Sequence, residues 1–120
     1  TIKDLEILLT KYKIPAGVEW QGDFGNYADG DNGHYSIVTQ LDDKKKQILI
    51  ADPFSKFAGI DRIFPLNKFV KRWWDENEIM DQNGRKKILH DKHLIFIVTK
   101  NNRRFPHILG FKKTPLTYAR

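Results

Sequence analysis

The sequence predicts an α+β fold, a twisted and mostly antiparallel sheet with one N-terminal helix and one inserted helix. Leucines and isoleucines recur at helical spacing at the start of the chain. Two apolar, β-branched runs flank a short charged segment at residues 42–46, which is typical of a hairpin. An almost wholly apolar run follows at residues 93–99. A length of 120 residues fits a single domain with one hydrophobic core.

A helix and a short strand are predicted first. Residues 2–13 form an amphipathic helix, which begins with the capping pattern of Thr1 and Asp4 and ends before Pro15. Residues 16–20 then form a short strand. The apolar face of the helix consists of Ile2, Leu5, Leu8 and Leu9.

The β-hairpin is the strongest structural prediction. Its strands are residues 34–41 and 47–52. Before it, residues 21–33 are rich in glycine, aspartate and asparagine, so they are predicted to form a long loop of a kind that is often functional or mobile. After it, residues 53–60 form a loop and residues 61–64 a short strand.

A second helix and a last strand complete the predicted fold. Residues 65–77 form the helix, and residues 81–87 form a turn around an Asn-Gly pair. The apolar run at residues 93–99 is predicted to be a central strand of the sheet. Residues 100–120 form a basic, irregular tail. The apolar face of the second helix consists of Leu66, Phe69, Val70 and Trp73, so Trp73 is predicted to lie in the core, with Trp74 at its edge.

The composition argues against a membrane-spanning helix and against sites that need cysteine within this chain. No apolar run approaches the roughly 20 residues of a membrane-spanning helix, and the N-terminus lacks the pattern of a signal peptide. The compartment is not fixed by this. The chain contains no cysteine, which excludes disulfides, thiolate zinc sites and a cysteine nucleophile within it. The first residue is not methionine, which fits a processed or excised chain.

The charge is divided unevenly along the chain. Residues 1–43 carry eight acids and three bases, a net charge of −5, and residues 44–120 carry seven acids and eighteen bases, a net charge of +11. No nucleic-acid-binding motif accompanies the basic runs, so solvated turns and strand ends are the preferred interpretation and nucleic-acid binding is not expected. The runs are Lys44–Lys46, Arg85–Lys87, Arg103–Arg104 and Lys112–Lys113.

His34 and Asp52 are the residues with the clearest chemical potential. His34 begins the first strand of the hairpin and Asp52 ends the second, so both lie at the end far from the turn. A histidine that donates its Nδ1 proton to a carboxylate has a fixed tautomer, and its other nitrogen can take a proton from a nucleophile. Gly33 allows close approach beside the histidine, and Pro53 ends the strand after the aspartate. On spacing alone, a polar strand end and a common Asp-Pro turn explain these residues more simply.

Metal and phosphate sites are not predicted, and no cofactor is expected. His90 and His93 precede a strand, where positions three apart face opposite sides. The glycine-rich loop lacks the lysine and hydroxyl residue of a phosphate-binding loop. Its oxygen-bearing residues do not have the spacing of an EF-hand; they are Asp23, Asp29, Asp31 and Asn32.

Three segments taken together point to a family. Residues 33–38 have the sequence Gly-His-Tyr-Ser-Ile-Val, residues 48–53 have Ile-Leu-Ile-Ala-Asp-Pro, and residues 65–69 have Pro-Leu-Asn-Lys-Phe with Trp73 following. In this order and spacing they resemble the C-terminal half of the papain-like bacteriocin-processing (double-glycine leader) peptidases. The resemblance covers roughly residues 1–99, and its motifs are individually short.

The resemblance implies the sheet lobe of a papain-like fold and a Cys–His–Asp mechanism of peptide-bond hydrolysis. His34 would be the general base and Asp52 its orienting carboxylate. The family's nucleophilic cysteine, and a glutamine of its oxyanion hole, belong to a helical lobe upstream of this segment. We therefore expect the chain alone to be inactive and to be the C-terminal part of a larger domain. Trp20, Gly33 and Tyr35 would line the cleft.

The expected partners follow from the same resemblance. They are a peptide or protein substrate, and either the upstream helical lobe or a second copy of the chain, because a lobe without its partner exposes apolar surface. Two other functions stay open: a degenerate, non-catalytic domain of the same fold that docks a peptide, and a basic surface module.

Overall fold

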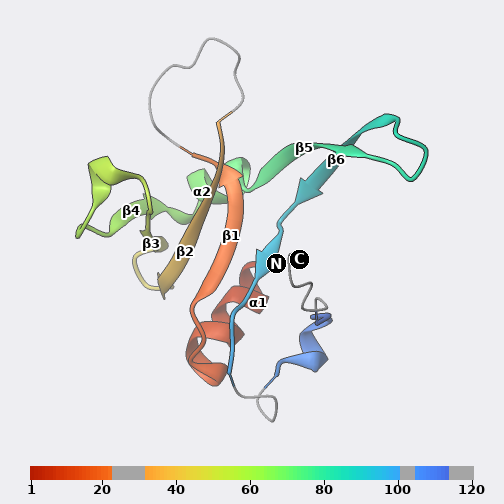
Figure 1. Ribbon diagram of the computed structural model, residues 1–120. Coiled ribbons are helices and arrows are strands. Elements are labelled where there is room, and N and C mark those ends of the chain that lie inside the picture. Colours follow the sequence, from red (N-terminus) through yellow and green to blue (C-terminus); the bar gives the residue numbers. More distant parts are fainter. Residues whose placement is uncertain (23–31, 101–104, 114–120) are drawn as a thin grey trace.

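A five-stranded antiparallel sheet with the strand order β4-β3-β2-β1-β7 forms the centre of the protein (Figure 1). The computed structural model describes residues 1–22, 32–100 and 105–113. It confirms the predicted α+β class and the central hairpin. The strands of this sheet are β1 (Ala16–Gln21), β2 (Gly33–Asp42), β3 (Gln47–Ala51), β4 (Arg62–Pro65) and β7 (Ile95–Phe96).

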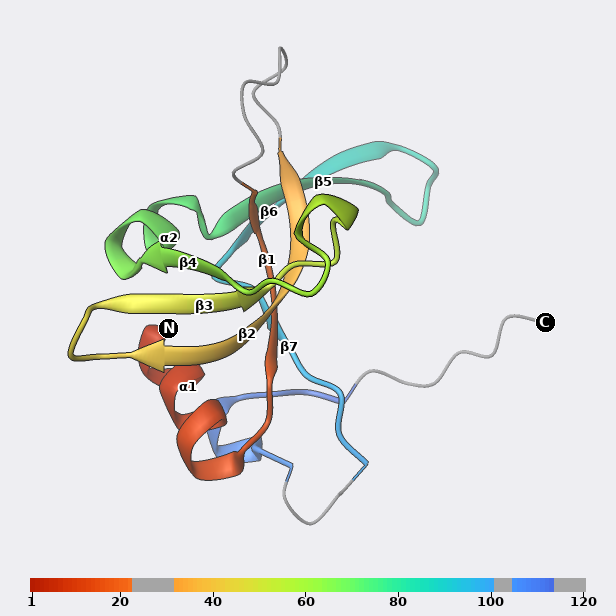
Figure 2. The same ribbon diagram turned by 90° about the vertical axis from the view of Figure 1, so that its left-hand side faces the viewer.

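The two helices lie on one side of this sheet (Figure 2). Helix α1 (Ile2–Ile7) starts at the predicted capping box, in which the Thr1 side chain accepts a hydrogen bond from the backbone nitrogen of Asp4. It continues as the π-helical segment η1 (Leu8–Tyr12). Helix α2 (Leu66–Arg72) follows β4 directly. No helix among the described residues is long and apolar enough to cross a membrane.

The core lies between these helices and the sheet, where four aromatic rings meet. Trp20 packs edge-on against Phe64 with 5.2 Å between ring centroids, and Phe69 contacts both Trp20 and Trp73 at 5.6 and 5.3 Å. Trp73 is buried as predicted, and Trp74 is partly exposed. The other fully buried apolar side chains are Leu5, Leu8, Ala16, Val18, Val38, Ile48 and Ile50. Each large side chain buried here contributes about 1.5–3 kcal/mol relative to an exposed one.

The second helix is shorter than predicted. It ends at Arg72, and Trp74 begins a second, two-stranded sheet formed by β5 (Trp74–Met80) and β6 (Lys86–Lys92). The predicted extension through Asn77 is therefore wrong. Tertiary contacts override the helical pattern here, because the Trp73 indole donates to the Leu94 carbonyl at 3.0 Å and fixes the helix end against the following chain.

The turn around Asn83 and Gly84 is confirmed, and it closes the β5–β6 hairpin. The Asp81 carboxylate accepts hydrogen bonds from the backbone nitrogens of Asn83 and Arg85, both at 2.8 Å. This hairpin projects from the body of the protein (Figure 1).

The apolar run at residues 93–99 is not a central strand, so this prediction is wrong. Only Ile95 and Phe96 pair with β1, at the edge of the sheet, and Val98 is 89% exposed. His93 adopts a left-handed backbone conformation with a φ of 58°, which separates this segment from β6. Ile95 and Ile97 pack against the core, which accounts for part of the run's apolar character.

The remaining segments are short turns. A single 3₁₀ turn, η2 (Ser55–Phe57), lies in the connection between β3 and β4. Near the C-terminus a second one, η4 (His107–Leu109), brings Leu109 and Phe111 against the core, so part of the predicted irregular tail is packed. Two of the basic runs lie at the β2–β3 turn and at the start of β6, as expected for solvated turns and strand ends. Most of the loop predicted for residues 21–33 lies outside the described residues.

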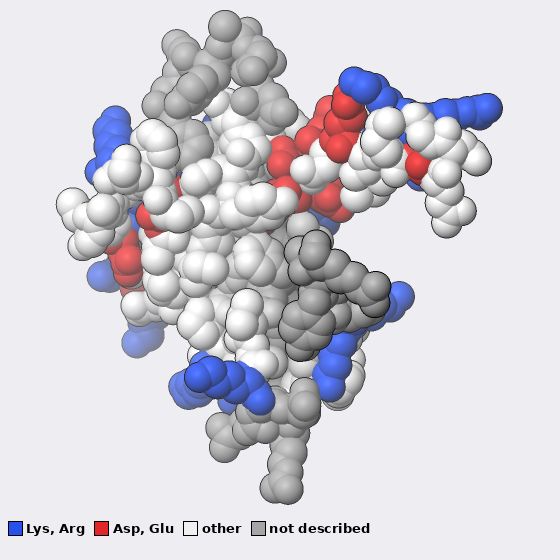
Figure 3. Space-filling view, in the orientation of Figure 1, with Lys and Arg blue, Asp and Glu red and all other residues white. Residues whose placement is uncertain are grey.

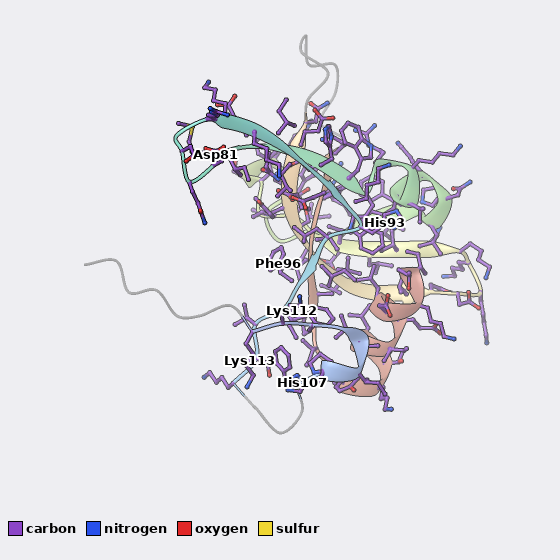
Figure 4. The ribbon with its side chains drawn as sticks, turned by 90° about the vertical axis from the view of Figure 1, so that its right-hand side faces the viewer. Asp81, His93, Phe96, His107, Lys112 and Lys113 are labelled. Carbon is purple, nitrogen blue, oxygen red and sulfur yellow. The ribbon has the colours of Figure 1, made fainter. Side chains whose placement is uncertain are left out.

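The face of the sheet opposite the helices carries an aromatic contact that spans β1. Phe96 points away from the helices (Figure 4), and its ring lies over Gly17, where a Cβ atom would stand only 2.2 Å from the ring. The ring then meets Tyr35 edge-on, with 5.9 Å between centroids. Glycine at position 17 is thus what allows β7 and β2 to touch across β1.

We expect Gly17→Ala to lower the free energy of unfolding by about 1–3 kcal/mol, because the added methyl group displaces the Phe96 ring. Urea unfolding measures this change. A double-mutant cycle with Phe96→Ala should show that the two substitutions are coupled, with a smaller effect of Gly17→Ala once the ring is absent. Additive effects would show that the ring does not depend on Gly17.

Candidate active site at the end of the hairpin

His34 and Asp52 are in contact. The distance between His34 Nε2 and Asp52 Oδ1 is 2.7 Å. The Asp52 side chain is fully buried, while the His34 side chain is 18% exposed. The histidine therefore forms the accessible end of a pair whose carboxylate is withdrawn from solvent.

A register shift in β2 puts the two side chains on the same face of the sheet. Val38 pairs with Ile50, but Gln40 pairs with Leu49, so Thr39 is an extra residue in β2. Without this bulge, Asp52 would stand opposite Ile37, whose side chain lies on the other face. With it, Asp52 falls on the face of His34, Ser36 and Val38, diagonally across from the histidine.

Asp52 is held by two further donors. The backbone nitrogen of Phe54 donates to Asp52 Oδ1 at 2.9 Å, and Arg62 Nη1 donates to Oδ2 at 2.7 Å. Both carboxylate oxygens are thus used, and the bonds reach β2, β4 and the segment after β3. This arrangement fixes the carboxylate independently of the histidine.

Arg62 is a site residue that sequence analysis missed. Its guanidinium carbon lies 4.0 Å from the Phe57 ring centroid and 4.7 Å from that of Phe64, so it stacks on aromatic rings while it pairs with Asp52. An arginine at the start of an apolar strand is the only signal that the sequence offers. This signal does not indicate that Arg62 pairs with Asp52, ten residues earlier in the chain.

Burial of the Asp52 carboxyl acts to raise its pKa, and three hydrogen bonds act in the opposite direction. They come from the backbone of Phe54, from Arg62 and from His34, and the charge of His34 adds to them. Their sum exceeds the effect of burial, so the pKa of Asp52 lies below its ordinary value. Asp52 is therefore an ionised acceptor at neutral pH, the state that an orienting carboxylate needs.

The histidine ring is oriented differently from the expectation. Nε2, rather than Nδ1, faces Asp52. When Nε2 carries the proton donated to Asp52, Nδ1 is the basic nitrogen. A nucleophile served by His34 would accordingly have to approach the Nδ1 side of the ring.

The other predicted cleft residues are distributed around the pair. Trp20 stands opposite His34 in the β1–β2 register, but it is buried in the core and donates to Ser36 Oγ at 3.0 Å. Gly33 makes room for a neighbour, because a Cβ atom there would stand 2.5 Å from the Asp75 carboxylate. Tyr35 points to the opposite face of the sheet and is 52% exposed. Trp20 therefore belongs to the core next to the histidine, while Tyr35 belongs to a different surface.

His90 and His93 have separate neighbours and do not share a metal site. His90 Nδ1 pairs with Glu76 at 3.0 Å on the exposed hairpin, and His93 stacks on Trp73. Within the described ranges, no group of three or more histidines, aspartates or glutamates is arranged to hold a metal ion. Asp23, Asp29 and Asp31 lie outside the described residues.

Comparison of the chain with protein-family models, with curated proteins and with solved structures finds no match in any of the three. A buried, ionised carboxylate orients a partly exposed imidazole, which can accept a proton on the nitrogen that faces away from the carboxylate. Ser36, the hydroxyl on the same face, is buried and bonded to Trp20, so it is not placed to react.

We expect Asp52→Asn to lower the free energy of unfolding by about 3 kcal/mol at neutral pH, because it leaves the Arg62 guanidinium nearly buried without its charge partner. Urea unfolding monitored by tryptophan fluorescence measures the loss. Asp43→Asn is the control, since Asp43 forms an exposed ion pair with Lys46 and such pairs contribute about 0–1 kcal/mol.

The same comparison should depend on pH. The pKa of Asp52 is lower in the folded chain than in the unfolded chain, where it is about 3.9. The ionised carboxylate therefore stabilises the fold above that pH, and this contribution is lost as the pH falls through the folded-state pKa. The stability gap between the wild type and Asp52→Asn should shrink below about pH 4. A gap that is constant down to acid unfolding would contradict this assignment.

Proposed function

We propose that this chain is a cysteine-peptidase-like domain in which His34 is the general base and Asp52 its orienting carboxylate. The observation that carries the proposal is the 2.7 Å contact between His34 Nε2 and the buried Asp52 carboxylate. The chain has no cysteine, so the thiol would come from polypeptide outside these 120 residues. In the assembled site, His34 would convert that thiol to a thiolate, which attacks a peptide carbonyl carbon.

Three features of the site support catalysis over a purely structural ion pair. His34 is the exposed member of the pair, so a nucleophile can approach it. Asp52 is held by Arg62 and Phe54, so its orientation does not depend on the histidine. Trp20 is buried opposite His34 in the β1–β2 register, with the Arg62 guanidinium carbon 5.7 Å from its ring centroid, so the pair borders the apolar core.

A non-catalytic peptide-docking domain is the second candidate, and one observation favours it. An apolar hollow of about 360 Å³ lies beside the backbone of Asp52, and it is lined mainly by Tyr35, Ile37, Ala51, Pro53 and Phe96. A surface of this kind can hold an apolar side chain of a peptide without any chemistry at His34.

We expect a cysteine of the full-length polypeptide to be alkylated by iodoacetamide in a manner that depends on His34. At about pH 6, a thiol with a pKa near 8.5 is only about 0.3% ionised, whereas a thiol paired with an imidazolium is largely thiolate. His34→Ala should therefore slow alkylation of that cysteine about 100-fold at this pH. Mass spectrometry of the alkylated peptide identifies the cysteine and gives the rate.

His90→Ala is the matched control, because His90 also contacts a carboxylate but lies on the exposed hairpin. It should leave the alkylation rate unchanged. Equal rates in the wild type and His34→Ala, for every cysteine of the polypeptide, would overturn the catalytic proposal and favour docking.

A further inference from the structure

The open face of the sheet, opposite the helices, carries an apolar hollow and, near it, buried carboxylate side chains. Figure 3 views this face, on which uncharged residues occupy the centre and acidic residues gather near the base of the β5–β6 hairpin. Phe96, Tyr35 and Ile37 are partly exposed there and border the hollow of about 360 Å³. The surface is therefore apolar on one side and acidic on the other.

Glu19 is the unusual residue of this face. It lies in β1 directly opposite Tyr35 and is 1% exposed. Its Oε1 accepts a hydrogen bond from Asn77 Nδ2 at 3.1 Å, but among the described residues its buried Oε2 has no hydrogen-bond partner. A buried carboxylate oxygen without a donor is costly to the fold, so a ligand that brings a donor to this oxygen would be favoured.

The surroundings of Glu19 add negative charge. The same Asn77 amide also donates to Asp91 Oδ2 at 3.2 Å, so one neutral group bridges two carboxylates. Asp75, which is also buried, accepts from Gln21 at 2.8 Å nearby on the same strand and hairpin. Within the described part of the chain, the groups that donate to Glu19 and Asp91 are uncharged.

Tyr35 is the exposed member of this cluster. Interaction of its hydroxyl with the Glu19 carboxylate, together with burial and the neighbouring acids, raises the pKa of Tyr35 to about 12. The ring is nevertheless half exposed and touches Phe96 at the edge of the hollow. Tyr35 thus connects the hollow, which it lines, with Glu19, which stands opposite it in the neighbouring strand.

We propose that this open face binds a polypeptide segment that presents an arginine or lysine beside an apolar side chain. The apolar side chain would occupy the hollow bordered by Tyr35, Ile37 and Phe96. The basic group would pass beside the Tyr35 ring and donate to Glu19 Oε2, with Asp91 contributing to the charge. This site lies on the other face of the sheet from His34, so it goes beyond the proposed peptidase chemistry.

The chemistry of the cluster selects a basic side chain over other ligands. The negative charge repels nucleic acid and other anions. The described acids do not form a metal-binding group. A guanidinium or ammonium group supplies the hydrogen-bond donors that Glu19 Oε2 lacks and compensates the carboxylates at the same time.

The test uses the chain as it is, with two probe peptides, Ac-Leu-Arg-Leu-NH₂ and its citrulline counterpart, which has the same shape without the charge. Titrations followed by ¹⁵N NMR should show shifts at Gly17, Glu19 and Phe96, with affinity for the arginine peptide at least about tenfold higher. In Glu19→Gln, which retains the acceptor for Asn77, this preference should disappear. Equal affinity for the two peptides, or a preference that persists in Glu19→Gln, would overturn the proposal.

Two further measurements separate recognition from folding. Glu78→Gln removes an exposed acid that pairs with Lys86 on the same hairpin, so it should leave the preference for arginine unchanged. Glu19→Gln should be at least as stable as the wild type without peptide, because it removes a poorly satisfied buried charge. If Glu19→Gln unfolds instead, Asp91→Asn gives the second test, and it should reduce the preference without removing it.

Discussion

The geometry of the candidate site depends on the hydrogen bonds that hold the buried Asp52 carboxylate. Desolvating a charge is expensive unless hydrogen bonds compensate it, and here they come from three separate segments. His34 in β2, the backbone of Phe54 after β3 and Arg62 in β4 all meet at two oxygens. The same residue thus closes the connection between β3 and β4, anchors Arg62 over its aromatic rings, and orients the imidazole. Stability and the proposed chemistry cannot be separated at this position.

Much of this arrangement is predictable from local patterns. The apolar runs and the charged turn identified the central hairpin, and the ends of that hairpin identified His34 and Asp52 as neighbours. What the patterns could not supply is the bulge at Thr39. A single extra residue exchanges the faces of a strand, and here Val38 and Leu41, on either side of it, both pack in the core. The ring orientation of His34 and the partnership of Arg62 depend on contacts between strands, so they too were beyond the sequence.

The wrong predictions share a physical cause. Residues 74–77 continue the helical pattern of α2, and residues 93–99 have the composition of a buried strand. In both places a contact distant in sequence decides the outcome: the Trp73 indole bonds to the Leu94 carbonyl, and Phe96 packs over Gly17. The hydrophobic periodicity of a sequence describes only which face of one helix or strand is apolar. These contacts instead join residues about 20 or about 80 positions apart, and their free energy depends on loop closure and on packing.

Asp52 and Glu19 are both buried acids, but they differ in how completely the chain supplies hydrogen bonds to their carboxylates. This difference separates a structural role from a proposed ligand-binding role. Both are nearly inaccessible, although Asp52 follows the end of β3 and Glu19 lies within β1. Asp52 has a donor on each oxygen, one of them a guanidinium, so its charge is compensated within the chain. Among the described residues, Glu19 accepts a hydrogen bond from the neutral Asn77 amide on one oxygen and from none on the other. A glutamine or an apolar residue at position 19 would serve stability alone at least as well. An incompletely compensated carboxylate beside an apolar hollow is instead the arrangement of a surface that completes its hydrogen bonds with a partner.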